Sequence, residues 1–274
     1  MTSETVEPLS YSSSNELLSC QQKYVYRKVQ KVDRDVDAPM DTLAMDIGST
    51  LHKCLEDCNH DLTGFEVETL FKVMKAYQVP NEQGPMLWAM LRKYKELHLS
   101  SDVTCVSVEE EKKDEDYIGY VDAIMKDRDG GLWITDLKTA AKISPFLTSR
   151  LPRDRQLNIY LHKLGKEKFK GCKYRVVTKS TLKRRKDESF DYYSDRVYER
   201  IKAVEYTIPI ELMTPDEEGE RFKDLRNIQV DLWKGKKPIR NFQNCDSYFR
   251  PCEYWSKCHG QIYSDEPKIT EISI

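Results

Sequence analysis

The sequence predicts an α/β fold in which a mixed central β-sheet is flanked by helices. Three consecutive segments, residues 104–111, 117–126 and 132–139, alternate apolar and polar side chains with a period of two, which is typical of half-buried strands. Helical patterns precede and follow them, so the element order is α, β-β-β, α, β, α. A length of 274 residues suits one elaborated domain, 1–274, that carries a helical insertion at about 60–100.

The first half of the chain begins with helical patterns. Residues 12–29 indicate a helix capped near Ser14 or Asn15, which would place Cys20 on its body. Residues 46–58 put Leu51 and Leu55 on one helical face, with His52 beside them. Two more helical stretches, 66–77 and 85–97, are separated by Pro80 and Gly84. We expect these two stretches to form a helical cap.

The second half continues from the three strands. A Gly-rich turn, 127–131, joins the second strand to the third. A helix is predicted at about 153–164, followed by a strand at 172–180. Residues 194–208 and 217–235 both have helical patterns, and we expect a helix at each.

Composition narrows the class of protein. The chain is 39% hydrophobic and 33% charged, and no apolar run reaches the length of a membrane span. The first residues resemble neither a secretory signal nor a transit peptide, which predicts a cytoplasmic protein. Eight cysteines in that compartment argue against a disulfide framework.

Charged residues interrupt the second and third predicted strands. Asp136 and Lys138 are two apart, so their side chains leave the same face of a strand, and a hairpin can bring Asp122 alongside. Two converging carboxylates repel each other unless a cation lies between them, and a divalent metal is the usual solution. A neighbouring lysine can orient a water molecule and offset charge on a phosphate. Alone, the Asp-x-Lys pattern is more often a solvent-facing ion pair.

Four short motifs together are more specific. They are "GSTLH" (48–52), "GYVD" (119–122), "DLK" (136–138) and "QLNIY" (156–160). Their order and spacing resemble the RecB-like branch of the PD-(D/E)XK nuclease superfamily, over about residues 20–258. The resemblance implies a PD-(D/E)XK nuclease core in which His52, Asp122, Asp136 and the Leu137 carbonyl bind Mg²⁺ or Mn²⁺ and Lys138 is the catalytic lysine. A supporting acid is implied at Glu109 or Glu111, and the choice between them stays open.

Other residues are candidates for contact with a nucleic acid. In the resembling nucleases, the residues that match Gln156 and Tyr160 border the active site and contact the substrate. We expect Tyr160 to stack on a base. Residues 166–186 hold ten of the 44 Lys and Arg side chains despite a net charge of −2. We expect this basic region, with Lys183, Arg184 and Arg185, to guide the phosphate backbone. A solvated basic surface is the alternative.

Four of the cysteines form a separate pattern. Cys20 lies near the start of the chain, and Cys245, Cys252 and Cys258 follow the core at 240–260. Four thiolates suit an iron–sulfur cluster or zinc. The iron–sulfur nucleases that the chain resembles, of the AddB, CRISPR-adaptation and phage exonuclease types, also have one cysteine before the core and three after it. A 4Fe-4S cluster that joins the two ends of the chain is therefore implied, with Zn²⁺ as the rival, although Phe249 stands where the first of the three later cysteines usually lies.

These observations lead to one leading function and two alternatives. The leading expectation is a metal-dependent deoxyribonuclease, an exonuclease on single strands or DNA ends, that serves recombination, repair or phage DNA processing. DNA is its expected partner, with a helicase or a recombination protein as a further partner. The sequence has no helicase motif, so any motor must come from a partner. The resemblance implies the cytoplasm of a bacterium or a phage-infected cell. The alternatives are a CRISPR-adaptation nuclease within an integrase complex and a catalytically idle DNA-binding or scaffold module with the same fold.

Overall fold

The computed structural model describes residues 6–35, 42–247 and 250–259 of the chain. The chain divides into two compact units. The sheet unit is Asp41–Phe222, and the terminal unit combines Met1–Met40 with Lys223–Ile274. The expected active-site residues therefore all belong to the sheet unit, and the four cysteines of the expected cluster belong to the terminal unit.

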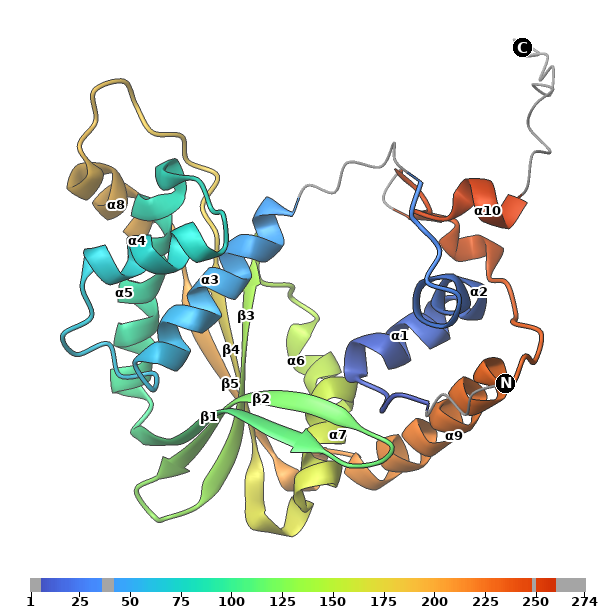
Figure 1. Ribbon diagram of the computed structural model, residues 1–274. Helices are drawn as coiled ribbons and strands as arrows, with labels where there is room; N and C mark the ends of the chain where they lie inside the picture. The colour runs from blue at the N-terminus through green and yellow to red at the C-terminus, as the bar shows by residue number, and fades with distance from the viewer. Residues whose placement is uncertain (1–5, 36–41, 248–249, 260–274) are drawn as a thin grey trace, which may run out of the picture. The chain divides into compact units, whose positions relative to one another are not determined.

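A five-stranded mixed sheet forms the centre of the sheet unit (Figure 1). Its strands, in spatial order, are β1 (Val103–Lys113), β2 (Ile118–Asp127), β3 (Leu132–Ala140), β4 (Phe169–Thr178) and β5 (Ala203–Pro209). Strands β3 and β4 are parallel, and the other neighbouring pairs are antiparallel. The mixed sheet flanked by helices is confirmed, and it fits a nuclease core of the expected kind.

Helices pack on both sides of this sheet. They are α3 (Leu43–Asp57), α4 (Val67–Ala76), α5 (Gly84–Ser100), α6 (Leu147–Arg150), α7 (Arg155–Leu164) and α8 (Phe190–Tyr198). Figure 1 shows α3, α4, α5 and α8 gathered on one side of the sheet and α7 on the other. The expected helices at 66–77 and 85–97 are thus present as α4 and α5. Short 3₁₀ helices connect these elements at Asn81–Gln83, Leu151–Arg153, Lys166–Lys168 and Ile210–Leu212.

The main core lies between the sheet and the helices α3, α4, α5 and α8. Leu51 of α3 and Met90 of α5 are fully buried there, and they meet Leu137 and Val177 from the two parallel strands. Burial of large apolar side chains contributes roughly 1.5–3 kcal/mol each. This packing fixes the position of α3 over the carboxyl end of β3.

The prediction of one helix over residues 194–208 was wrong. Helix α8 ends at Tyr198, and residues from Ala203 onward form β5, which pairs with β4. A period of 3.6 fitted the apolar residues, but Val204, Tyr206 and Thr207 are good strand formers. The decisive interaction is distant in sequence, because Glu205 pairs with Arg175 of β4.

The terminal unit contains short elements from both ends of the chain. They are α1 (Tyr11–Ser19), α2 (Gln21–Tyr24), a π-helix (Val25–Val29), the 3₁₀ helix Phe242–Asn244, the hairpin of β6 (Asp246–Ser247) and β7 (Arg250–Pro251), and α10 (Trp255–His259). Helix α9 (Pro215–Trp233) contributes residues to both units. Among the described residues, no helix is long and apolar enough to span a membrane.

The first helix differs from its prediction at both ends. Its N-cap is Ser10, whose hydroxyl accepts a hydrogen bond from Ser13 N at 3.1 Å, rather than Ser14 or Asn15. Several serines in a row make the choice of cap ambiguous in sequence. Cys20 has an extended backbone, φ −165°, and separates α1 from α2, so it does not lie on the body of a helix. Phe249 lies outside the described residues.

Candidate active site and metal centre

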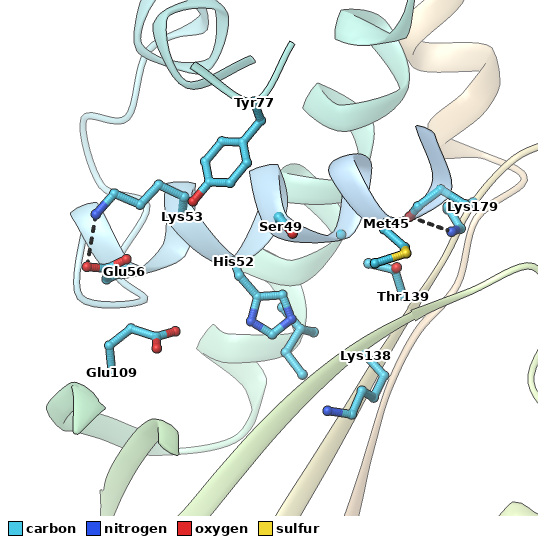
Figure 2. Close-up of a pocket in the computed structure, with 13 residues that line it drawn as sticks. Met45, Ser49, His52, Lys53, Glu56, Tyr77, Glu109, Lys138, Thr139 and Lys179 are labelled. Atoms are coloured by element: carbon cyan, nitrogen blue, oxygen red, sulfur yellow. Dashed lines mark hydrogen bonds and ion pairs between the residues drawn. The ribbon is translucent and has the colours of Figure 1, made fainter. Parts of the chain in front are cut away.

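Helix α3 forms one wall of a cleft of about 720 Å³ (Figure 2). Its apolar residues Ile47, Leu51 and Leu55 are buried against the core. The opposite helical face therefore turns His52 and its neighbours toward the cleft, where Leu137 and Lys138 of β3 line the facing wall. The sequence motifs at 48–52 and 136–138 thus meet in one cavity.

Three side chains that could hold a metal ion converge where His52 and Glu109 line this cleft. Donor atoms of His52, Glu109 and Asp122 lie within 4.8 Å of one another. His52 Nδ1 is 3.5 Å from Asp122 Oδ2, and that oxygen accepts a hydrogen bond from Leu137 N at 2.8 Å. One imidazole nitrogen and two carboxylates form a donor set that suits a divalent cation such as Mn²⁺ or Mg²⁺.

Glu109 resolves the choice that the sequence left open. The flanking pairs Val108–Ala123 and Glu110–Val121 in the β1–β2 ladder bring it level with Asp122. Its backbone has φ 46°, a left-handed conformation that residues with a Cβ rarely adopt and that recurs at functional sites. Glu111 lies elsewhere, with its carboxylate accepting a hydrogen bond from Tyr120 at 3.2 Å. We therefore add Glu109, and not Glu111, to the candidate metal site.

The electrostatics of the site favour uptake of a cation. Burial and the nearby Asp122 carboxylate raise the pKa of Glu109 to about 7. Burial and Asp122 also raise the pKa of Asp136, against the opposing effect of Lys138. Asp136 is 1% exposed, and its Oδ2 atom has no hydrogen-bond partner within the described residues. A buried, unpartnered carboxylate oxygen is costly unless a proton or a cation compensates it.

Asp136 is not a member of the group formed by His52, Glu109 and Asp122. Its Oδ1 atom accepts a hydrogen bond from Lys138 Nζ at 2.8 Å. Lys138 also donates to Gln156 Oε1 at 3.0 Å, while 38% of its side chain stays exposed. The lysine is therefore held in one orientation at the cleft and remains accessible to a substrate.

Gln156 and Tyr160 belong to α7 and form a chain of hydrogen bonds behind Lys138. Gln156 Nε2 donates to Tyr160 Oη at 2.8 Å, and that hydroxyl donates to Tyr120 O at 2.6 Å. Tyr160 is 4% exposed, so its ring does not present a face to a base, which corrects the stacking role expected from the sequence. In this arrangement Tyr160 links α7 to β2, the strand that carries Asp122.

The basic region at 166–186 divides into two parts. Lys173 and Arg175 are buried in β4 and paired with Glu205, so these two do not form a basic surface. Lys183, Arg184 and Arg185 are exposed in the segment after β4. Arg184 Nε donates to Glu188 O at 2.9 Å, which ties this segment together locally. Lys168 and Lys170 are exposed as well, and residues 183–186 form the longest run of exposed basic side chains in this region.

A buried polar network that the sequence did not reveal lies behind the candidate metal site. His60 is 3% exposed, hydrogen bonds to Tyr94 and to the backbone of Asp122, and has its pKa lowered to about 3 by burial and by Arg175. Tyr94 Oη in turn accepts a hydrogen bond from Arg175 Nη1 at 2.5 Å. His60 comes from the turn after α3 and Tyr94 from α5, so helical packing assembles what no local motif signals.

The four cysteines of the terminal unit lie near one another without forming a closed site. Burial and the thiols of Cys258, Cys252 and Cys20 raise the pKa of Cys245. Cys252 N donates to Cys245 O at 2.7 Å. Within the described residues, no three cysteine sulfur atoms lie within 4.8 Å of one another, a spacing that a single zinc ion would impose. The thiols are neighbours, and the expected cluster is not shown.

Comparison with known families agrees with this geometry. The family model described as the PD-(D/E)XK nuclease superfamily matches residues 8–259 of the chain. None of the curated proteins compared with the chain matches it. The match includes His52, Glu109, Asp122, Asp136 and Lys138, and it extends over most of both units.

Proposed function

Because the chain belongs to the PD-(D/E)XK nuclease superfamily, we propose that it is a metal-dependent deoxyribonuclease of the RecB-like branch, acting on single strands or DNA ends. The observation that carries this proposal is the convergence of His52, Glu109 and Asp122, of which His52 and Glu109 line the same cleft as Lys138. A catalytically idle scaffold has no need to keep three ligands and a positioned lysine together.

Each residue has a distinct part in the proposed reaction. His52, Glu109 and Asp122 would hold the cation, and we propose the Leu137 carbonyl and the unpartnered oxygen of Asp136 as further ligands. A divalent cation, when bound, polarises the phosphate and lowers the pKa of a coordinated water. Lys138 Nζ orients the attacking water and offsets the charge that develops on the phosphate. Gln156 keeps Lys138 aimed at the cleft through their 3.0 Å hydrogen bond.

The proposal extends to a second metal group in the terminal unit. We assign a 4Fe-4S cluster to Cys20, Cys245, Cys252 and Cys258, because four neighbouring thiols are the donor set of such a cluster. Its role would be to join the two ends of the chain.

Cleavage assays test the nuclease proposal. Anaerobically purified protein would be incubated with end-labelled and circular DNA, single- and double-stranded, with Mg²⁺, Mn²⁺ or EDTA. We expect metal-dependent cleavage of single strands or ends that EDTA abolishes, and loss of cleavage in Asp136→Ala and Lys138→Ala. Cleavage that continues in EDTA, or none with any DNA and either metal, would contradict the proposal. Cleavage of circles would show an endonuclease instead of an exonuclease.

A further inference from the structure

Lys179 is a cleft residue that the proposed reaction does not use. It follows the last residue of β4, and its backbone N donates to Ala140 O at 2.7 Å, which fixes it beside the carboxyl end of β3. Its Nζ atom lies 3.3 Å from Ala44 O, in the first turn of α3. The ammonium group is therefore held at the place where the sheet and α3 meet, on the wall of the cleft (Figure 2).

The charge of Lys179 has no carboxylate partner among the described contacts. The atom that receives its hydrogen bond is a neutral carbonyl, and partial burial lowers its pKa. Lys53, on the same cleft, contrasts with it, because Lys53 Nζ lies 2.9 Å from Glu56 Oε1 and 3.0 Å from Asp57 Oδ1. A half-buried cation with a neutral partner gains more from an incoming anion than one already neutralised.

Charges are distributed unevenly along the cleft. Figure 2 shows Glu109 and the paired Glu56 and Lys53 at one end and Lys138 with Lys179 at the other, with His52 between them. Met45 lies beside Lys179 and is 66% exposed, so an apolar surface accompanies the cation. Consider a DNA strand whose reacting phosphate lies at Lys138. Its next phosphate is attracted by the ammonium group if the strand continues toward Lys179, and is repelled by carboxylates if it continues in the other direction.

We propose that Lys179 binds the phosphodiester next to the scissile one on the same DNA strand, with Met45 against the adjoining sugar or base. The proposal rests on the nuclease function argued above and names a substrate contact of the same cleft. Lys179 would thus determine the direction in which the strand leaves the reacting phosphate, whereas Lys138 acts on that phosphate itself.

Binding and kinetics of matched variants test this contact. Affinity for a fluorescent oligo-dT would be measured in Ca²⁺ at several salt concentrations for the parent, Lys179→Met, Lys179→Arg and Lys53→Met. We expect Lys179→Met to weaken binding about tenfold and to reduce the salt slope by about 0.7, as loss of one phosphate contact predicts. Lys179→Arg should stay within about threefold of the parent because it keeps the charge. Lys53→Met should also stay within about threefold, since its charge is already matched.

The steady-state readout separates this role from a structural one. Lys179→Met should raise KM with little change in kcat, because a flanking contact acts equally in the ground and transition states. The loss of affinity in Lys179→Met should be the same for oligonucleotides with a 5′-phosphate and with a 5′-hydroxyl. A loss of affinity seen only with the 5′-phosphate would overturn the proposal and show that Lys179 binds a terminal phosphate. If the parent cleaves DNA but Lys179→Met binds the oligonucleotide as tightly as Lys53→Met, the Lys179 contact is refuted and the nuclease function stands. A parent that neither binds nor cleaves DNA would refute the contact and the proposed function together.

Discussion

Individual carboxylates of the candidate metal site would make the proposed metal binding sensitive to pH. The pKa of Glu109 is raised from 4.5 to about 7, and that of Asp136 is also raised, mainly by burial. Protons therefore compete with a cation for these oxygens below about pH 7, and metal binding must displace them. The carboxylates of Glu109 and Asp136 are costly to ionise without a cation, and a bound cation would offset that cost.

We predict that the apparent affinity for Mn²⁺ rises at least about tenfold between pH 6 and pH 8. Glu109→Gln should bind Mn²⁺ more weakly and with a flatter pH dependence, because one competing proton is gone. Isothermal titration of the metal-free protein and of this variant measures both effects. Equal pH profiles for the two proteins would show that Glu109 is not a ligand.

The raised pKa of Glu109 also makes the free energy of unfolding of the metal-free chain depend on pH. Because the folded pKa of Glu109 lies above its unfolded value, the folded chain binds more protons between about pH 4.5 and 7. The stabilising contribution of that protonation is present at acid pH and is lost as the pH rises through 7. The metal-free parent should therefore lose more stability from pH 5 to pH 8 than Glu109→Gln does, and Mn²⁺ should restore it at pH 8.

At the scale of elements, one buried ion pair joins β4 and β5 to α5. Arg175 is fully buried, and its Nε atom lies 2.8 Å from Glu205 Oε2. It also donates to Tyr94 of α5, so the pair and the network behind Asp122 are continuous. A buried cation whose partner is removed is left uncompensated in a medium of low polarity.

We expect Glu205→Gln to lower the free energy of unfolding by about 3–5 kcal/mol, because it leaves Arg175 and Lys173 buried without a matching charge. Asp216→Asn is the matched control, since it removes the partner of exposed Lys166 and should cost less than about 1 kcal/mol. Urea denaturation measures both values. Equal, small losses in the two variants would contradict the assigned importance of the buried pair.

The elements also show how far the sequence alone could lead. Period-two alternation was sufficient to find β1, β2 and β3, although residues 134–137 of β3 are buried on both faces of the sheet. Strand β5 was missed because its charge pairs with Arg175, a partner about thirty residues away that no local pattern encodes. The position of Glu109 required the register of β1 on β2, and the burial of Tyr160 required the packing of α7. Local motifs therefore indicated the chemistry, whereas tertiary contacts selected its participants.

At the scale of the whole molecule, the chain has two units with separate metal chemistries in our proposal. The divalent cation belongs to the sheet unit, and the iron–sulfur cluster belongs to the terminal unit, where residues from both ends of the chain meet. Tyr26 Oη donates to Lys257 O at 3.1 Å, and Lys23 Nζ lies 3.1 Å from Glu253 Oε1. Protein contacts thus already join the two ends, and a cluster would strengthen that junction.

We predict about four iron atoms per chain after anaerobic purification, with the broad visible absorption of an iron–sulfur cluster. Cys20→Ser should lose iron and melt at a lower temperature, whereas Cys54→Ser, which changes a buried cysteine of the main core, should keep its iron. Metal analysis and thermal melting measure these outcomes. Stoichiometric zinc without iron would contradict the cluster and show that the four cysteines bind zinc instead.

The central claim is that the cleft between α3 and β3 is a metal-dependent hydrolytic site, and cleavage by Asp122→Asn tests it most directly. Asparagine keeps an oxygen that can accept the hydrogen bond from Leu137 N, so the local fold should persist while the negative charge that holds the cation is lost. In saturating Mn²⁺, single-turnover cleavage of end-labelled single-stranded DNA should slow by at least about a hundredfold relative to the parent. Circular dichroism and melting should match the parent. Cleavage at the parental rate by the folded variant would contradict the account.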